Sequence, residues 1–294
     1  MILEIQSATA ASVRQICHTL GLARSSFYQA AAPTVTRQDD RTLGERIERI
    51  FLRHRQRYGY RRIWHQLRDE GVTCAPTRVR RLMRQRGLRA VAPRQFVPRT
   101  SDGRADKPSP NLLVDQPLPT EPHRVWAGDI TFIPTQGGWL YLAVVLDLCT
   151  RKVVGWSLAD HMRASLVSDA LQQALGSQQL PAAATSLTGT TTTTIFHSDR
   201  GSQYSSTAFR NLLAQSNIQQ SMSARANPYH NAWTESFIGT LKTEMLRDGS
   251  FLSHADAKLE IFEYIEMYYN NHRKHSSLRY QTPAQFEQTI VLQN

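Results

Sequence analysis

The sequence predicts an all-α, basic region followed by an α/β domain built on a mixed five-stranded sheet. Three observations support this fold class. Apolar residues recur at helical spacing before residue 90, strand-like runs begin after residue 122, and seven prolines punctuate the segment from Val91 to Pro122. A length of 294 residues fits about two domains, and a hydrophobic content of 40% is sufficient for ordinary cores.

The net charge of +11 lies entirely in the first part of the chain. Residues 1 to 121 contain 22 Arg or Lys against 11 Asp or Glu, whereas residues 122 to 294 contain 13 against 13. This partition is typical of a protein that holds a polyanion with one part and acts on it with another. Nucleic acid is the leading candidate, although 30 Arg among 35 basic residues is also what a coding preference produces.

Cysteine usage and hydropathy exclude two other classes of protein. Cys17, Cys74 and Cys149 lie far apart with no Cys-x-x-Cys pair, so neither a disulfide framework nor a cysteine zinc site is indicated. No signal-like h-region begins the chain, and no uncharged apolar run approaches 18 residues. We expect a soluble, cytoplasmic protein that does not enter a membrane.

The first structural unit, at about residues 8 to 30, has the pattern of a helix-turn-helix. The apolar face of its first helix is formed by Val13, Ile16, Cys17 and Leu20. Gly21 interrupts that helix, and a short second helix holds Arg24 and Ser25. Since the second helix of such a motif enters the major groove, Arg24 and Ser25 are candidate DNA contacts. An ordinary helical hairpin is the alternative.

A second helical unit spans residues 41 to 90 and completes the basic region, 1–90. Its helical runs are separated by Gly59, Gly71 and Gly87. In the last run Val79, Leu82 and Met83 form an apolar stripe. The arginines of that run are expected to face solvent or phosphate: Arg78, Arg81, Arg84 and Arg86. We take Arg78, Arg81 and Arg84 as further candidate DNA contacts.

Residues 91–121 predict a semi-extended, proline-rich linker, and the α/β domain follows at 122–287, with a tail at 288–294. "HRVWAGDITFIP" and "WLYLAVVLDLCTRKVVGWSLA" predict three successive strands, joined at Gly137-Gly138 and at Cys149-Thr150-Arg151. The elements expected after them are a helix over 163–177, a strand ending at His197, a helix near 206–216, a strand near Ile218, and helices near 230–247 and 254–272. This order matches that of a ribonuclease-H-like domain.

Three carboxylates of this domain are candidates for metal-dependent phosphodiester chemistry, which needs hard oxygen ligands that converge in space. Asp129 lies in the middle of an apolar strand, where an unpaired carboxylate is costly. Asp199 follows a strand, at the end where α/β sites collect, and Glu235 lies on a helix face. Read singly, Asp199 is equally a turn residue before Gly201, and Glu235 is more often a solvated residue.

The face of the helix that carries Glu235 also carries Asn231 and Lys242, at about 100 degrees per residue. An amide and an ammonium group beside a carboxylate are suited to DNA phosphate, so Asn231 and Lys242 are candidate DNA contacts. Three other residues are considered as alternative metal ligands or as residues that assist the reaction. Asp147 is assigned to a hairpin turn, Glu244 lies opposite Glu235 on the helix, and His197 is left open between packing and assistance.

The chain resembles a known family through five motifs in order. They are "WAGDIT", "VLDLCTRKVVGW", "FHSDRGSQY", "NAWTESFIGTLKTE" and "YNNHRKHSSLRYQTPAQFE". Together with "YGYRRIWHQL" and "VRRLMRQRGLRA", these motifs resemble the second-reading-frame protein of insertion sequence 3 family transposases. The 35 residues between Asp199 and Glu235 match the DDE triad that this family shares with retroviral integrases. The resemblance covers about residues 8 to 287.

The resemblance implies a ribonuclease-H-like integrase core that nicks the ends of an insertion element and then transfers the freed strand. It implies Asp129, Asp199 and Glu235 as catalytic residues that hold two Mg²⁺ ions, with Mn²⁺ as a substitute. Lys242 matches the basic residue that the family places seven positions after the glutamate. The implied partners are double-stranded DNA, at terminal inverted repeats and target, further copies of the chain on that DNA, and an upstream-frame protein or fusion. When bound to DNA, the protein would lie in the nucleoid.

Two departures from the family pattern leave alternatives open. His230 stands where the family commonly has Asp, and the threonine-rich run before "IFHSDRG" is longer than expected. A DNA-binding regulator with an inactive core is therefore one alternative function, and a ribonuclease-H-like nuclease is the other. The three carboxylates favour an enzyme over the first, and the basic N-terminal region favours a transposase over the second.

Overall fold

The computed structural model divides the chain into two compact units, Met1–Ala90 and Val91–Asn294. The residues that the structure describes are 12–24, 34–91, 108–114, 116–178, 180, 184–185, 191–223, 232–246 and 249–292. Each unit is considered by itself.

The N-terminal unit begins with the expected short helix, α2 (Val13–Thr19). Ser12 caps it: the Ser12 side chain accepts a hydrogen bond from the Gln15 N–H, and the Gln15 side chain accepts one from the Ser12 N–H. Gly21 has φ of +61°, the left-handed conformation that ends the helix. The first helix and its break are thus confirmed, and Arg24 is exposed, whereas Ser25 lies outside the described residues.

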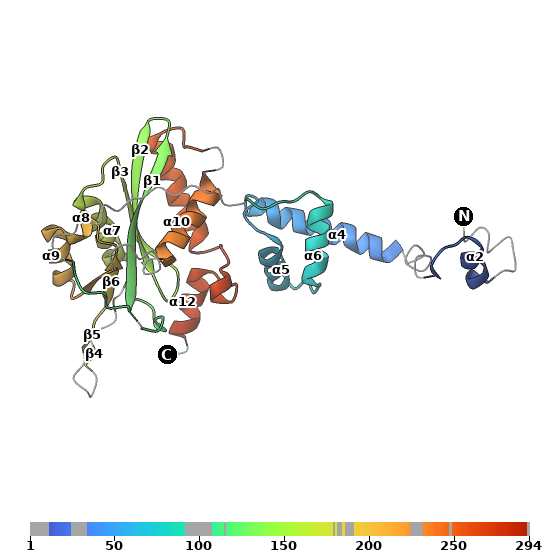
Figure 1. Ribbon diagram of the computed structural model, residues 1–294, viewed down its shortest axis with the longest axis horizontal. Helices are drawn as coiled ribbons and strands as arrows, with labels where there is room; N and C mark the ends of the chain where they lie inside the picture. Colours follow the sequence, from blue (N-terminus) through green and yellow to red (C-terminus); the bar gives the residue numbers. More distant parts are fainter. Residues whose placement is uncertain are drawn as a thin grey trace. The chain divides into compact units, whose positions relative to one another are not determined.

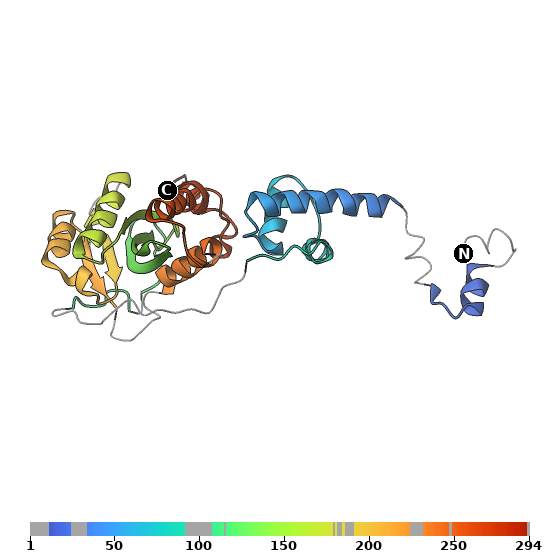
Figure 2. The same cartoon turned by 90° about the horizontal axis from the view of Figure 1, so that it is seen from above.

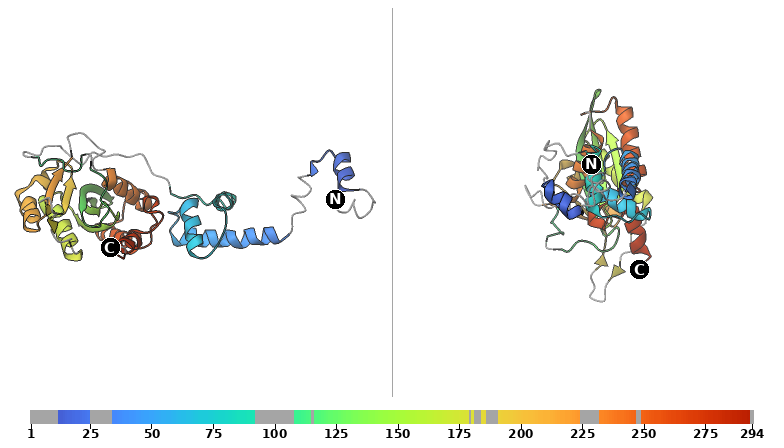
Figure 3. Two further views of the ribbon diagram at one scale, coloured as in Figure 1. Left: turned by 90° about the horizontal axis from the view of Figure 1, so that it is seen from below. Right: turned by 90° about the vertical axis from the view of Figure 1, so that its right-hand side faces the viewer.

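The second helical unit folds as three helices around one apolar core. They are α4 (Thr34–Arg53), α5 (Tyr60–Asp69) and α6 (Pro76–Gln85). In Figure 3, α5 and α6 lie against the C-terminal half of α4, which supplies Leu43, Ile47, Ile50 and Phe51 to the core. The predicted stripe of Val79, Leu82 and Met83 is buried there. Gly71 and Gly87 take positive φ where α5 and α6 end, as the sequence predicts.

Three arginines in and just after α6 bind acidic side chains of α4. Arg78 and Arg81 each bind one carboxylate oxygen of Asp40 at 2.7 Å, and Arg86 Nη1 lies 2.7 Å from Glu48 Oε2. Arg81 is exposed as expected, whereas Arg78 and Arg86 are partly buried, because α4 presents acidic residues to them. Arg84 remains exposed, with no ion pair among the residues described.

The second unit contains a five-stranded mixed sheet in the order β3-β2-β1-β6-β7. Its strands are β1 (Val125–Thr135), β2 (Gly138–Asp147), β3 (Val153–Ala159), β6 (Ile195–Ser198) and β7 (Gln219–Met222). Its helices are α7 (Ala164–Ser177), α8 (Ser202–Ser205), α9 (Thr207–Gln215), α10 (Ala232–Met245), α11 (His254–Phe262), the π-helical η2 (Glu263–Tyr269), the 3₁₀ turn η3 (Ser276–Leu278) and α12 (Pro283–Val291). β1, β2 and β3 are antiparallel, whereas β6 and β7 run parallel to β1. The ribonuclease-H-like order that the sequence predicts is confirmed.

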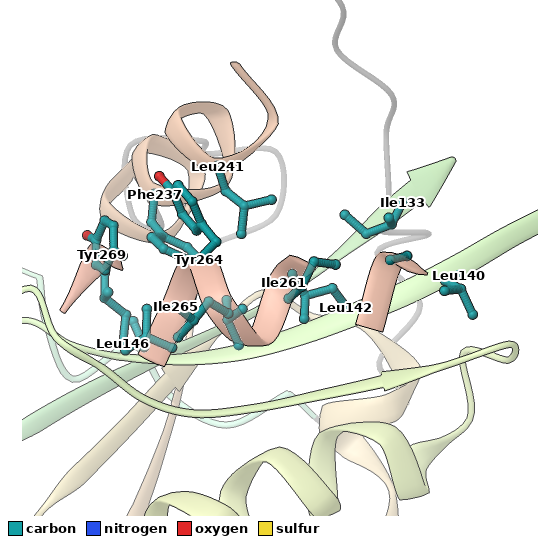
Figure 4. Packing of buried hydrophobic residues seen from close by; sticks show 14 of the residues in the cluster. Ile133, Leu140, Leu142, Leu146, Phe237, Leu241, Ile261, Tyr264, Ile265 and Tyr269 are labelled. Carbon is teal, nitrogen blue, oxygen red and sulfur yellow. The ribbon is translucent and has the colours of Figure 1, made fainter. Parts of the chain in front are cut away.

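Helices cover both faces of this sheet, as Figures 1 and 2 show. One face carries α7, α8 and α9, which bury Trp126 and Phe196. The other face carries α10, α11 and η2, and Figure 4 shows Ile261 of α11 beside Leu142 of β2 in a cluster that also contains Phe237 and Leu241 of α10. The alternation of side chains along β1 sends its even-numbered residues to the first face and its odd-numbered residues to the second.

Several elements were not expected from the sequence. A small hairpin, β4 (Ala184–Thr185) and β5 (Thr191–Thr192), forms a separate two-stranded sheet within the threonine-rich run. The helix predicted over 254–272 is instead α11 continued by η2, and α12 follows Thr282, whose side chain caps it. Residues 108–114, in the predicted linker, are bound to β7: the Leu112 N–H donates to the Ser221 hydroxyl at 2.9 Å. The domain limits predicted from the sequence stay a prediction.

None of the helices in the described parts of the chain is long and apolar enough to cross a membrane.

Candidate active site

Asp129 and Asp199 are brought to the same level of the sheet by the pairing of two parallel strands. β1 and β6 pair in a register that sets Trp126 opposite Phe196 and Ala127 opposite His197. Continuing this register by two residues sets Asp129 opposite Asp199, which directly follows the last residue of β6. Since β6 ends at Ser198, the edge of β1 beside Asp129 is not covered by that strand.

The turn after β6 fixes the orientation of Asp199. Its Oδ1 accepts a hydrogen bond from the Gly201 N–H at 2.9 Å, the pattern of an Asx turn. A Cβ on Gly201 would lie 3.0 Å from that same oxygen, so a larger residue would crowd the carboxylate. Oδ2 makes no hydrogen bond within the described part of the chain. Asp199 is thus a turn former that keeps one carboxylate oxygen available.

Helix α10 supplies the third carboxylate and a lysine. Phe237 and Leu241 are buried against the sheet, as the apolar arc of the sequence predicts. Glu235 is exposed and Lys242 is partly buried on another side of the helix. Both side chains lie close enough to Asp129 to affect its ionisation.

The electrostatics of the site centre on Asp129. Burial raises its pKa to about 8, and the negative charges of Asp199 and Glu235 act in the same direction. A hydrogen bond from the Ile130 N–H at 2.8 Å and the positive charge of Lys242 oppose this rise. Burial also raises the pKa of Glu235 and lowers the pKa of Lys242. Such a group of like charges is stable only when a proton or a cation neutralises it.

Carboxylate oxygens are the ligands that Mg²⁺ prefers, so the donor set of this site fits a hard divalent cation. Among the residues described, no three His, Cys, Asp or Glu side chains are grouped so that they could hold one ion. A pair of ions with one shared carboxylate needs only two protein carboxylates on each ion, because water and phosphate supply the rest. Asp199 and Glu235 both lie near enough to Asp129 for their charges to raise its pKa.

Asp147 has the structural role that its place in a hairpin predicts. It is fully buried, and its Oδ1 accepts hydrogen bonds from the Cys149 N–H, the Thr150 N–H and the Thr150 hydroxyl at 2.7 to 3.0 Å. Its Oδ2 accepts a fourth from the His123 N–H at 2.6 Å. Burial raises the pKa of Asp147, but these donors stabilise its charge.

Glu244 and the basic-aromatic segment near the C-terminus form a buried structural network. Arg273 Nη2 lies 2.9 Å from Glu244 Oε1, and the Tyr264 hydroxyl donates to Glu244 Oε2 at 3.0 Å. Arg273 and Lys274 are 4% and 5% exposed, so neither side chain is presented to DNA. For Arg273 and Lys274 this favours the role of closing the core against α10, whereas His275 is partly buried.

The remaining candidates all belong to the second unit. His197 is buried and lies 2.8 Å, Nδ1 to Oγ, from Ser221, which favours packing over assistance. Asn231 and His230 lie outside the described residues. Sequence reasoning missed Tyr204, the last residue of "FHSDRGSQY", which is buried beneath Gly128 of β1.

Family models match both units of the chain. The HTH-like domain matches residues 37–96, and two models of the integrase core domain match residues 119–228 and 216–283. The sheet order and the carboxylates of the second unit agree with these matches. The class of protein is therefore an integrase-core enzyme that carries a helix-turn-helix-like region.

Similar proteins identify the family within that class. The chain is 40% identical to the transposase for insertion sequence element IS904 of Lactococcus lactis, covering 87% of this chain and 97% of that protein. It is 38% identical to transposase InsF for insertion sequence IS3A of Escherichia coli, covering 94% of each. The chain belongs to the insertion sequence 3 family of transposases, and it is a DDE transposase.

Solved structures with a similar course of the chain include the HTLV-2 integrase catalytic core domain in complex with magnesium. It is 18% identical, has a TM-score of 0.42, and the match covers 57% of this chain and 97% of that one. The simian T-cell lymphotropic virus intasome in complex with a PP2A regulatory subunit is matched at 18% identity with a TM-score of 0.45, over 76% of this chain and 70% of that chain.

Proposed function

We propose that Asp129, Asp199 and Glu235 are the catalytic residues of this transposase and bind two Mg²⁺ ions, for which Mn²⁺ substitutes. The observation that carries the proposal is the electrostatic state of Asp129, a carboxylate in the central strand whose pKa is raised by burial and by two other carboxylates. An ionised carboxylate in this position costs stability unless a cation compensates its charge.

Each residue has a distinct task in the proposed site. The charges of both Asp199 and Glu235 act on Asp129, so Asp129 is proposed to serve both ions, while Asp199 and Glu235 would each hold one. When bound, the two ions activate the attacking oxygen and stabilise the leaving oxygen of the phosphodiester. Lys242 orients the terminal DNA through a phosphate, because its ammonium group lies on the same helix as Glu235 and close to Asp129. Asn231 is proposed to act with it.

The N-terminal unit is proposed to hold the terminal inverted repeats. Arg24 and Arg84 are exposed and suited to phosphate contacts, and Ser25 follows Arg24 in the same motif. Arg78 and Arg81 are held by Asp40, so their contribution to DNA binding requires that DNA either accept them in this orientation or displace the aspartate. The active assembly on DNA is proposed to contain several copies of the chain, with or without an upstream-frame protein.

The test is Mg²⁺-dependent cleavage and joining of a duplex that carries the element's terminal inverted repeats. We expect the wild-type protein to nick the duplex ends and join them, and Glu235→Gln to bind the duplex normally without cutting it. If both proteins bind equally and neither cuts with Mg²⁺ or Mn²⁺, the regulator is the correct function. If the wild type cuts any duplex without joining the ends, the correct function is that of a ribonuclease-H-like nuclease.

A further inference from the structure

Arg200 directly follows Asp199, and its side chain continues the sheet where strand β6 ends. In the parallel pair of β6 and β7, the Ser223 N–H donates to the Ser198 carbonyl at 2.9 Å. The next hydrogen bond of such a ladder would run from the backbone N–H of residue 200 to the Ser223 carbonyl. Arg200 Nε donates to that carbonyl instead, at 2.9 Å. The guanidinium group therefore lies at the carboxyl ends of β6 and β7, where ligands bind in open α/β sheets.

The protein uses only one nitrogen of this guanidinium group. The two terminal nitrogens of Arg200 make no hydrogen bond and no ion pair within the described part of the chain. The residue is partly buried, so solvent still reaches its side chain. A planar fork of two terminal nitrogens matches two oxygens of one phosphate group. The bond to Ser223 thus orients the fork and leaves it available to a ligand.

The turn that carries Arg200 is held by hydrogen bonds on both sides. The Gly201 N–H donates to Asp199 Oδ1 at 2.9 Å, and the Ser198 hydroxyl donates to the Asp199 carbonyl at 2.9 Å. A side chain anchored in such a turn loses little further freedom when it binds a ligand. Since Asp199 is one of the proposed metal ligands, the fork of Arg200 lies beside the proposed reaction site.

The charges at the site make a second cation useful for holding DNA. Asp129, Asp199 and Glu235 are anions, and so are the phosphates of the substrate. Lys242 acts on this group from helix α10, because its positive charge lowers the pKa of Asp129. Arg200 comes from the turn after β6 instead. The two cations belong to different elements and can therefore hold different phosphates of one strand.

We propose that Arg200 binds a backbone phosphate next to the scissile phosphate of the DNA, through its two terminal nitrogens, and so positions the bond that is cut. This inference rests on the proposed function of the site, to which it adds a residue that touches the substrate. The competing explanation is structural: an arginine whose whole task is to satisfy the Ser223 carbonyl. Two variants separate these explanations, because each keeps one of the two contacts and removes the other.

The experiment compares melting temperature and Mg²⁺-dependent cleavage of a terminal-repeat duplex for these variants of the full chain. In Arg200→Gln the amide nitrogen takes the place of Nε and can still donate to Ser223, but the charged fork is gone. We expect this variant to melt like the wild type and to lose about ten- to hundredfold in kcat/KM, as for a lost hydrogen bond to a charged group. Arg200→Lys keeps the charge and has a methylene group in place of Nε, so it should melt lower and lose less activity. Arg210→Gln, which removes a partly buried arginine from α9, is the matched control and should cleave like the wild type.

A second measurement identifies the phosphate. Single phosphates on either side of the scissile one are replaced, one at a time, by neutral methylphosphonates. One of these replacements should lower cleavage by the wild type about tenfold or more and have no further effect on Arg200→Gln, because the contact that it removes is already absent. In Arg200→Lys the same replacement should have a smaller effect than in the wild type.

Three outcomes would overturn the role of Arg200 alone. They are wild-type cleavage by Arg200→Gln, a larger loss of activity in Arg200→Lys than in Arg200→Gln, and losses that multiply at every replaced phosphate. A failure of the proposed function looks different. If the wild type binds the unmodified duplex and does not cut it with Mg²⁺ or Mn²⁺, the proposed function is wrong and the role of Arg200 falls with it.

Discussion

At the scale of single residues, the structure separates two aspartates by their surroundings. Asp147, which is fully buried, accepts four hydrogen bonds from His123, Cys149 and Thr150. Asp129, which is partly buried, accepts one from Ile130 within the described part of the chain and lies near two further carboxylates. The four donors around Asp147 stabilise its negative charge without any ligand. The negative charge of Asp129 has one donor and two like charges nearby, so it needs a bound cation to be stable. A carboxylate with few donors and many negative neighbours is therefore the better indicator of chemistry.

Asp129→Asn should stabilise the metal-free protein, because the amide removes a charge that burial and two carboxylates disfavour. The pKa of Asp129 is raised from 3.8 to about 8, so its ionisation costs stability as the pH rises from about 4 to 8 and costs most above 8. We expect the variant to gain about 2 kcal/mol or more at pH 8, since one pKa unit corresponds to about 1.4 kcal/mol. The gain should shrink toward pH 5.

Denaturant unfolding in EDTA at the two pH values measures this gain, and Asp147→Asn is the control. That variant replaces an acceptor of four hydrogen bonds, so it should destabilise the protein. A lower stability of Asp129→Asn at pH 8 would contradict the electrostatic description of the site.

At the scale of elements, α10 is held by two kinds of contact that face different ways. Phe237 and Leu241 pack it onto the sheet, while Glu244 ties its end to Tyr264 of η2 and to Arg273 beyond it. The side of the helix that bears Glu235 and Lys242 makes neither of these contacts. The orientation of the third proposed ligand thus depends in part on a buried ion pair nine residues further along the helix.

Arg273→Met should destabilise the catalytic unit by about 3 to 5 kcal/mol, because it leaves Glu244 buried without its countercharge. Urea unfolding followed by tryptophan fluorescence measures this, since four of the five tryptophans lie in this unit. Arg41→Met removes an ion pair with Glu45 whose side chains are 80% and 52% exposed, and it should change stability by less than about 0.5 kcal/mol. If the two variants lower the free energy of unfolding equally, the buried ion pair contributes no more to stability than the exposed one.

At the scale of the whole molecule, the two structural units differ in net charge. The basic excess belongs to the residues before 122, and the second unit carries the carboxylates. Binding of DNA and reaction with it should therefore respond to different variants. The proposed function thus assigns DNA binding to the first unit and the reaction with DNA to the second.

Arg84→Ala should weaken binding to any duplex and lower the salt dependence of binding by about one counterion, because Arg84 is exposed and has no ion pair with the residues that the structure describes, so it can contact phosphate. Fluorescence anisotropy at several salt concentrations measures both quantities. Lys258→Ala, which removes an exposed charge from α11, and Glu235→Gln should leave them unchanged. If Lys258→Ala weakens binding as much as Arg84→Ala, the division of charge does not determine where DNA binds.

The sequence was sufficient for the order of the strands and for most helices, because alternation and helical spacing are local properties. It was also sufficient to place Asp147 in a turn. It did not reveal the pairing of Arg78 and Arg81 with Asp40, since partners 38 and 41 positions away leave no local pattern. For the same reason Tyr204 was missed: its relation to Gly128 exists only after β1 and β6 have paired.

The parallel pairing of β1 with β6 has a consequence for shortened forms of the chain. The two aspartates are 70 positions apart in the chain, and Glu235 follows 36 positions later. A chain that ends before residue 235 therefore lacks one of the three proposed ligands, and a chain that ends before residue 195 lacks the strand that sets Asp199 beside Asp129.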